Sequence, residues 1–86
     1  MKFRISRHAS EEMQRRSISL EMIESVLNGP QQVVTDPEGK SVYQSKIDFP
    51  SGKAYLVRVI VAEEADTSVV VTVYRTGKVE KYWRKP

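Results

Sequence analysis

The sequence contains no cysteine and only one histidine among its 86 residues. A chain without cysteine forms neither disulfides nor thiolate metal sites, and a single histidine is too little for a zinc site. We therefore expect neither a metal nor a cofactor. The absence of cysteine is also typical of reducing compartments, which favours a cytoplasmic location.

Long apolar runs are missing as well. No segment approaches the ~20 consecutive apolar residues of a membrane-spanning helix, and the first residues, MKFRIS, lack the apolar stretch of a signal peptide. The sequence also has no P-loop, no dinucleotide-binding glycine motif and no nucleophile elbow. These absences predict a protein without membrane contact, and they exclude the common motif-defined nucleotide-binding and hydrolase classes.

The sequence does contain enough apolar residues for one small folded domain, residues 1–86. Hydrophobic residues make up 40% of the chain, which argues against disorder. The core of so short a chain is limited, so a bound partner would add stability.

The charge is distributed unevenly along the chain. The net charge is +3, made up of +3 in residues 1–16, −4 in residues 17–73 and +4 in residues 74–86. If the two basic ends meet in space, they form one positive patch suited to phosphate. The alternative is that basic residues cluster at the termini by chance.

The N-terminal third is predicted to hold a short strand and two helices. Residues 2–5 alternate between polar and apolar, as in a strand, and Ser6 is placed to cap a helix over residues 7–16. Ser19 is placed to cap a second helix, whose apolar residues recur at helical spacing. The Asn-Gly-Pro sequence at residues 28–30 predicts the end of that helix.

From residue 31 onward the apolar period changes to that of strands. Turn residues at 36–40 and 50–53 separate these strands. Residues 68–75 form the most apolar segment and are expected to be the central strand, while residues 79–83 read as an edge strand or a tail. The other predicted strands are residues 31–36, 41–49 and 54–64. The order predicts an α+β fold, with two helices packed on one face of a twisted antiparallel sheet.

A recurring combination of residues gives the chain a family resemblance. The residues that carry it are His8-Ala9, Met13, Arg16, Ile18-Ser19, Ile23, Val26-Leu27, Pro30 and the run 70–74. Together they resemble the domain-of-unknown-function family 4258, which is similar to the RelE/ParE and BrnT toxins of bacterial toxin–antitoxin modules. Two positions depart from the pattern: Glu12 stands where such sequences usually carry arginine, and Ser17 where they usually carry glycine.

The resemblance implies both a fold and an activity. The fold is a RelE-like β-α-α-β-β-β(-β) arrangement. For the RelE and BrnT branch, the activity is metal-independent cleavage of RNA, inhibited by an antitoxin protein; many ParE-type relatives instead bind a protein target. RelE-like toxins often use arginine, lysine and tyrosine side chains from the sheet and the C-terminus. In this chain the resemblance therefore implies catalytic roles for Arg58, Tyr74, Arg75 and Lys81.

His8 is a further catalytic candidate, because cleavage of RNA without metal needs a base and an acid near a bound phosphate. It is the one side chain whose unperturbed pKa lies close to neutral pH. On a helix, His8, Glu12 and Arg16 share one side, so a carboxylate and an arginine would lie near the imidazole. The alternative is that the imidazole only packs or contacts a partner and that the Glu–Arg pairs merely stabilise the helix.

Other basic and aromatic residues are candidates for holding RNA. Aromatic rings stack on unpaired bases while lysine and arginine bind the phosphate backbone. In the alternative interpretation, the aromatic residues near the C-terminus cover the core and the basic ones keep the tail soluble. The candidate RNA- and phosphate-binding residues are Arg15, Arg16, Lys78, Tyr82 and Arg84.

Three functional hypotheses follow. The first is a toxin-like, metal-independent endoribonuclease whose partners are RNA and an antitoxin protein. The second is a module of the same fold that binds a protein without catalysis. The third is a domain that binds nucleic acid without cutting it, which the modest net charge of +3 disfavours.

Overall fold

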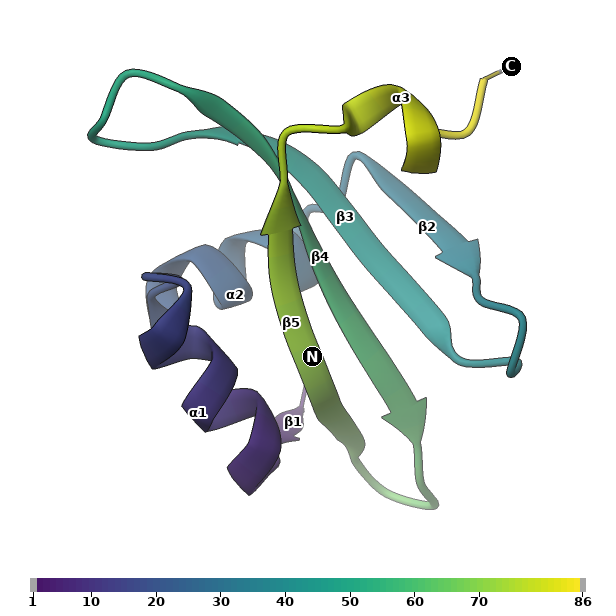
Figure 1. The fold of residues 1–86 in the computed structure, drawn as a ribbon. Helices are drawn as coiled ribbons and strands as arrows, with labels where there is room; N and C mark the ends of the chain where they lie inside the picture. The colour runs from purple at the N-terminus through teal and green to yellow at the C-terminus, as the bar shows by residue number, and fades with distance from the viewer. Residues whose placement is uncertain (1, 86) are drawn as a thin grey trace.

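The chain folds into one five-stranded sheet, with two helices between its first and second strands and a short helix after its last strand (Figure 1). A computed structural model describes residues 2–85. The elements, in chain order, are β1 (Phe3–Ile5), α1 (Arg7–Arg15), α2 (Leu20–Asn28), β2 (Gln32–Thr35), β3 (Ser41–Asp48), β4 (Ala54–Glu63), β5 (Ser68–Thr76) and α3 (Val79–Tyr82). The α+β class predicted from the sequence is confirmed.

The strand order in the sheet is β1-β5-β4-β3-β2. The last four strands form an antiparallel meander, because short turns join each of them to the next. β1 pairs with β5 in parallel, so the sheet predicted to be antiparallel is mixed and mostly antiparallel, with one parallel pair at this edge. The two helices lead from β1 to β2 at the opposite edge of the sheet, and the meander β2–β3–β4–β5 then returns the chain to the side of β1. The central strand is β4, and the segment predicted to be central, β5, lies one place away from it.

Both predicted helix caps are confirmed. The Ser6 hydroxyl accepts a hydrogen bond from the backbone N–H of Ala9 at 3.0 Å, and the Ser19 hydroxyl accepts one from Met22 at 3.1 Å. Each bond satisfies a backbone donor that a helix N-terminus otherwise leaves free. Because Ser6 also donates to the carbonyl of Val71 at 3.2 Å, the start of α1 is fixed to β5.

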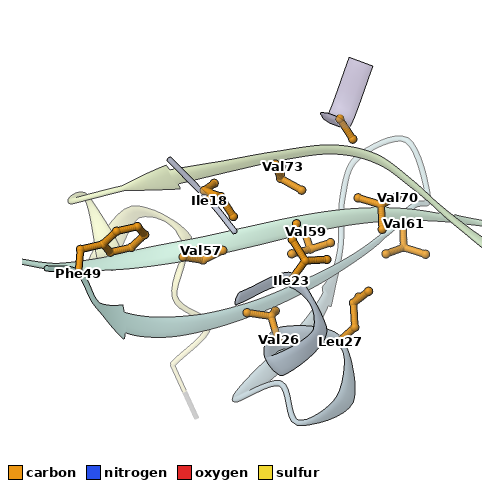
Figure 2. Packing of buried hydrophobic residues seen from close by; sticks show 11 residues of the cluster. Ile18, Ile23, Val26, Leu27, Phe49, Val57, Val59, Val61, Val70 and Val73 are labelled. Carbon is orange, nitrogen blue, oxygen red and sulfur yellow. The ribbon is translucent and has the colours of Figure 1, made fainter. Parts of the chain in front are cut away.

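The hydrophobic core lies between one face of the sheet and the two longer helices (Figure 2). α2 contributes Ile23, Val26 and Leu27, which point toward the valines of β4 and β5. α1 lies along β5 and contributes the fully buried Ala9. Packing at this face leaves the opposite face of β4 and β5 free of α1 and α2.

The C-terminal segment differs from its prediction. Residues 79–83 were expected to form an edge strand or a tail, but Val79–Tyr82 form the helical turn α3. α3 lies on the face of the sheet opposite α2 (Figure 1). None of the helices described between residues 2 and 85 is long and apolar enough to cross a membrane.

Candidate functional site

Four polar side chains lie in one row across the open face of the sheet, by which we mean the face that α1 and α2 leave free and that α3 partly covers. Each of them is paired with the next across neighbouring strands: Gln32 of β2 with Gln44 of β3, Gln44 with Arg58 of β4, and Arg58 with Tyr74 of β5. Side chains of directly paired residues point to the same face and lie close enough to bond. We call these four residues the polar row.

Hydrogen bonds connect the polar row from end to end. Gln44 is fully buried, and its Nε2 donates to Oε1 of Gln32 at 2.8 Å. Its Oε1 accepts from Nε of Arg58 at 2.8 Å, and Nη1 of Arg58 donates to the hydroxyl of Tyr74 at 2.6 Å. The guanidinium of Arg58 is therefore held at two of its three nitrogens. Within residues 2–85, its Nη2 atom makes no hydrogen bond and remains available to a ligand.

The C-terminal segment attaches to the polar row. The ring of Tyr82 stacks on the Arg58 guanidinium, with 4.3 Å between the guanidinium carbon and the ring centre. The Tyr82 carbonyl accepts from Gln44 at 3.2 Å, and the main chain of Arg84 exchanges hydrogen bonds with the Gln32 side chain. Buried amide groups need such partners, so the polar row and α3 stabilise each other.

A groove of about 440 Å³ opens beside the polar row. Arg58 and Tyr74 line it together with His8, which α1 brings to this face of β5 and leaves exposed to solvent. Asp36, Glu38 and Lys40 line the end of the groove at the β2–β3 turn, where Lys40 pairs with Glu38 at 3.7 Å. This sheet-face groove thus has a cationic part around Arg58 and a part of mixed charge, with a net charge of −1, at the turn.

The two tyrosines near Arg58 differ in acidity. Burial raises the pKa of Tyr74 above its ordinary value of 10.0, although the neighbouring Arg58 acts in the opposite direction. A hydrogen bond with the Lys81 side chain lowers the pKa of Tyr82. Tyr74 therefore keeps its proton at neutral pH. Its oxygen accepts from Arg58, and hydrogen bonding of its O–H with Tyr82 adds to the raised pKa, so Tyr74 acts as a hydrogen-bond donor on this face.

A second groove lies on the helix side of β5. It has a volume of about 650 Å³, and Arg15, Arg16, Arg75 and Lys78 line it. The guanidinium carbon of Arg75 lies 4.4 Å from the ring centre of Phe49 and 4.7 Å from that of Tyr55. These rings fix the position of the cation. None of the described residues that line this helix-side groove is acidic.

Glu12 holds the two arginines at the end of α1. Its side chain is only 10% exposed, and its carboxylate lies 3.2 Å from Arg15 and 3.5 Å from Arg16. Arg16 also reaches toward β5, where its guanidinium carbon lies 6.0 Å from the ring centre of Tyr74. The acidic residue at the position where the resembling sequences carry arginine thus orients two neighbouring cations and offsets one of their two positive charges.

The structure divides the predicted site residues into three groups. His8, Arg58 and Tyr74 meet in the sheet-face groove, whereas Arg15, Arg16, Arg75 and Lys78 line the helix-side groove. The third group lies on or after α3: Tyr82 stacks on Arg58, and Lys81 lies 5.3 Å from the Tyr82 ring centre. In this third group Arg84 bonds through its main chain, and its side chain is exposed.

Sequence reasoning missed the two glutamines of the polar row. An amide at an alternating position of a strand reads as a solvated residue, and only the cross-strand register shows that Gln44 is enclosed between Gln32 and Arg58. The available signal was that Gln44 lies between Val42 and Lys46 on one face of its strand. In the part of the chain from residue 2 to residue 85, no three carboxylate or imidazole groups gather as metal ligands.

The fold and the site together define the class of this protein. It is an α+β domain with a hydrogen-bonded arginine on the open face of its sheet. Within that class, the sequence matches the family described as "Domain of unknown function (DUF4258)" over residues 5–75. The chain belongs to this family. The matched range includes both helices, β2 to most of β5, and the whole polar row, and it ends before α3. No curated protein and no solved structure matches the chain.

Proposed function

We propose that the protein is a metal-independent endoribonuclease of the toxin type. The observation that carries this proposal is the fixed Arg58 guanidinium, which shares one groove with an exposed imidazole and a protonated phenol. Few groups are needed for this chemistry: a cation for the phosphate, a base and an acid. The sheet-face groove holds one of each.

Arg58 would bind the phosphate at which the RNA is cut. Its Nε hydrogen and one Nη1 hydrogen are engaged by Gln44 and Tyr74, so its other three hydrogens, two of them on Nη2, are donors held in fixed directions. Planar guanidinium groups bind phosphate oxygens through two parallel hydrogen bonds. Because the polar row has already ordered the side chain, little conformational entropy is lost when the phosphate binds.

His8 and Tyr74 would transfer the protons. His8 removes the proton from a ribose 2′-hydroxyl, and the 2′-oxygen forms a bond to the adjacent phosphorus. The bond from phosphorus to the 5′-oxygen breaks, and Tyr74 donates its proton to that leaving oxygen. The products are a 2′,3′-cyclic phosphate and a 5′-hydroxyl. Arg58 stabilises the charge that accumulates on the phosphorane between these two events.

The resemblance to RelE and BrnT toxins extends the proposal to a partner. An antitoxin protein that fills the sheet-face groove would block RNA from Arg58 and inhibit cleavage. Such a partner would also cover the open sheet face, which α1 and α2 leave free. A toxin of this kind acts on cytoplasmic RNA, which agrees with the compartment expected for a chain without cysteine.

Substitutions in the groove test the proposal. His8→Gln, Tyr74→Phe and Arg58→Lys should each lower the rate of cleavage of a single-stranded RNA in EDTA by roughly 100-fold or more, the usual contribution of such groups. Arg4→Gln is the matched control, because Arg4 lies on β1 and pairs only with the exposed Glu64 at 3.8 Å. Rates are measured by gel electrophoresis of an end-labelled strand, and circular dichroism verifies the fold of each variant.

Two results would oppose the proposal. If the wild-type protein cuts no RNA at any concentration, the nuclease hypothesis is wrong. If His8→Gln, Tyr74→Phe and the Arg4→Gln control all cut as fast as wild type, the protein is a nuclease whose catalytic residues lie outside the sheet-face groove.

A further inference from the structure

The two grooves lie on opposite faces of the same strand. Tyr74 and Arg75 are consecutive residues of β5, so their side chains point to opposite faces of the sheet. Tyr74 lines the sheet-face groove, and Arg75 lines the helix-side groove. The main chain of β5 alone separates the proposed cleavage site from a second cationic groove.

Arg16 connects the two grooves. It lines the helix-side groove and lies 6.0 Å from the Tyr74 ring centre, measured from its guanidinium carbon. Its Nη2 atom lies 3.5 Å from Oε1 of Glu12, one helical turn earlier. Eight residues separate Arg16 from His8 on or next to one helix, which corresponds to roughly 12 Å. That spacing is too long for the two side chains to bind one phosphate, but it suits successive phosphates of one strand.

The charges of the sheet-face groove define the direction in which a bound strand leaves it. At the β2–β3 turn the groove carries Asp36, Glu38 and Lys40. Lys40 pairs with Glu38 at 3.7 Å, so the net charge of −1 at this end comes from Asp36 and disfavours phosphate. Arg16 lies outside this groove, but its guanidinium carbon is 6.0 Å from the ring centre of Tyr74, which lines the groove. A strand with a phosphate on Arg58 therefore leaves past Arg16, around the margin of β5, and enters the helix-side groove.

The margin of β5 is open at this point. β1 pairs only with Ser68–Val70, so within the part of the chain described, no strand pairs with the outer edge of residues 72–76. α1 runs along this margin and ends at Arg15 (Figure 1). A polynucleotide can turn from one face of β5 to the other just past that end only if it is flexible. Single strands meet this condition, whereas stiff duplexes do not.

We propose that the helix-side groove binds the phosphate backbone of the same RNA strand that the sheet-face groove cuts. This inference rests on the proposed function and narrows its substrate class. The substrate is single-stranded RNA, long enough to pass from one face of β5 to the other. Arg15, Arg75 and Lys78 bind phosphates on the far side, and Arg16 binds the one at the turn.

Binding of uridine oligonucleotides of two lengths tests the inference. The probes are fluorescein-labelled single strands of 12 and 3 nucleotides, measured by fluorescence anisotropy between 50 and 200 mM salt. The double variant Arg15→Gln/Lys78→Gln removes two exposed cations of the helix-side groove without touching the core. It should bind the 12-mer roughly tenfold more weakly and reduce its salt slope by about 1.4, because each phosphate contact contributes about 0.7 in single strands.

The 3-mer is the internal control, because it is too short to leave the sheet-face groove. Its affinity should be the same for the double variant and for the wild type, and Arg4→Gln should bind both probes as the wild type does. A 12-base-pair RNA duplex should bind more weakly than the 12-mer strand. The inference is supported if Arg75→Gln, added to the double variant, weakens the 12-mer further while the 3-mer is unaffected.

Three outcomes would overturn the inference: unchanged 12-mer binding by the double variant, equal binding of duplex and single strand, or tighter binding of a 12-residue polyglutamate peptide than of the RNA 12-mer. The last result would assign the helix-side groove to an acidic protein. A failure of the nuclease proposal is seen in the cleavage assay and not in the anisotropy measurement. In that case the 12-mer would bind through both grooves without being cut.

Discussion

At the scale of single residues, Ser17 is held in a conformation that suits glycine. Its φ is 54°, in the left-handed region. The N–H of Ser17 bonds to the carbonyl of Gln14 at 3.4 Å, and that of Ile18 bonds to the carbonyl of Met13 at 2.9 Å. These two bonds form a Schellman motif, which closes α1 and places the buried Ile18 against the core. The resembling sequences carry glycine at this position.

Ser17→Gly should therefore stabilise the protein by about 0.5–1 kcal/mol, because glycine adopts positive φ without steric cost. Urea unfolding should show a higher midpoint with an unchanged slope. Gly39→Ala is the reverse control. Because Gly39 has a φ of +87°, this substitution should destabilise the protein by a similar amount. A lower midpoint for Ser17→Gly would show that the Ser17 side chain contributes more than its backbone strain costs.

Tyr74 should make stability depend on pH in the alkaline range. Its pKa in the folded protein is raised above 10.0 by burial, whereas the unfolded chain titrates near 10. As pH rises above 10, the unfolded state loses this proton first, so the free energy of unfolding falls until Tyr74 ionises in the folded state as well.

Tyr74→Phe removes this contribution. The difference between the wild-type and variant free energies of unfolding should be constant below pH 9, and the wild type should lose more stability than the variant between pH 9 and pH 11. Urea unfolding at several pH values measures both curves, and comparing the two proteins cancels the titration of the lysines. Parallel curves up to pH 11 would contradict the raised pKa.

At the scale of elements, most boundaries could be predicted from the sequence. The spacing of apolar residues and the cap residues were sufficient to predict α1, α2 and the strands of the meander, because these signals are local in the sequence. The parallel pairing of β1 was not predictable, since it arises when the two helices lead the chain to the opposite edge of the sheet and the meander returns it to the side of β1. α3 was missed because residues 79–83 are too few for a strand period to be distinguished from a helix period.

α3 takes its position from contacts that the local sequence does not contain. Gln44 donates to the carbonyl of Tyr82, and the Lys46 ammonium lies 4.1 Å from the ring centre of Trp83. These contacts come from β3, which lies more than thirty residues earlier in the chain. Tertiary contacts of this kind override weak local preference in so short a segment.

Gln44→Leu tests this dependence. The substitution keeps the volume of a fully buried side chain, but it leaves Arg58 Nε and the Tyr82 carbonyl without their partner. We expect destabilisation by about 2–3 kcal/mol, as for buried groups that lose a hydrogen bond, together with faster hydrogen exchange in α3. Cleavage of RNA should slow as well, because the Arg58 guanidinium is no longer fixed.

Lys46→Gln is the control for this experiment, because Lys46 is exposed and contacts Trp83, the residue after α3, without belonging to the polar row. It should change the free energy of unfolding by less than about 1 kcal/mol. Equal effects of Gln44→Leu and Lys46→Gln would show that the polar row does not support α3.

At the scale of the whole molecule, the two basic segments of the chain meet at β5. α1 runs along this strand, and Lys78 follows directly after it, so the cations of residues 1–16 and 74–86 line the helix-side groove together. This juxtaposition was one of the two alternatives that the charge distribution allowed. The sequence also suggested His8, Arg58 and Tyr74 separately. That they share a groove depends on strand register, which no local pattern reveals.

The most direct test of the proposed function uses the chemistry of the 2′-hydroxyl. A uridine 12-mer and its fully 2′-deoxy counterpart are incubated with the wild-type protein in EDTA, and the products are identified by mass spectrometry. The account predicts that both strands bind through their phosphates, that only the RNA is cut, and that its fragments end in 2′,3′-cyclic phosphate and 5′-hydroxyl. Cleavage of the deoxy strand, or an intact RNA after incubation, would contradict it.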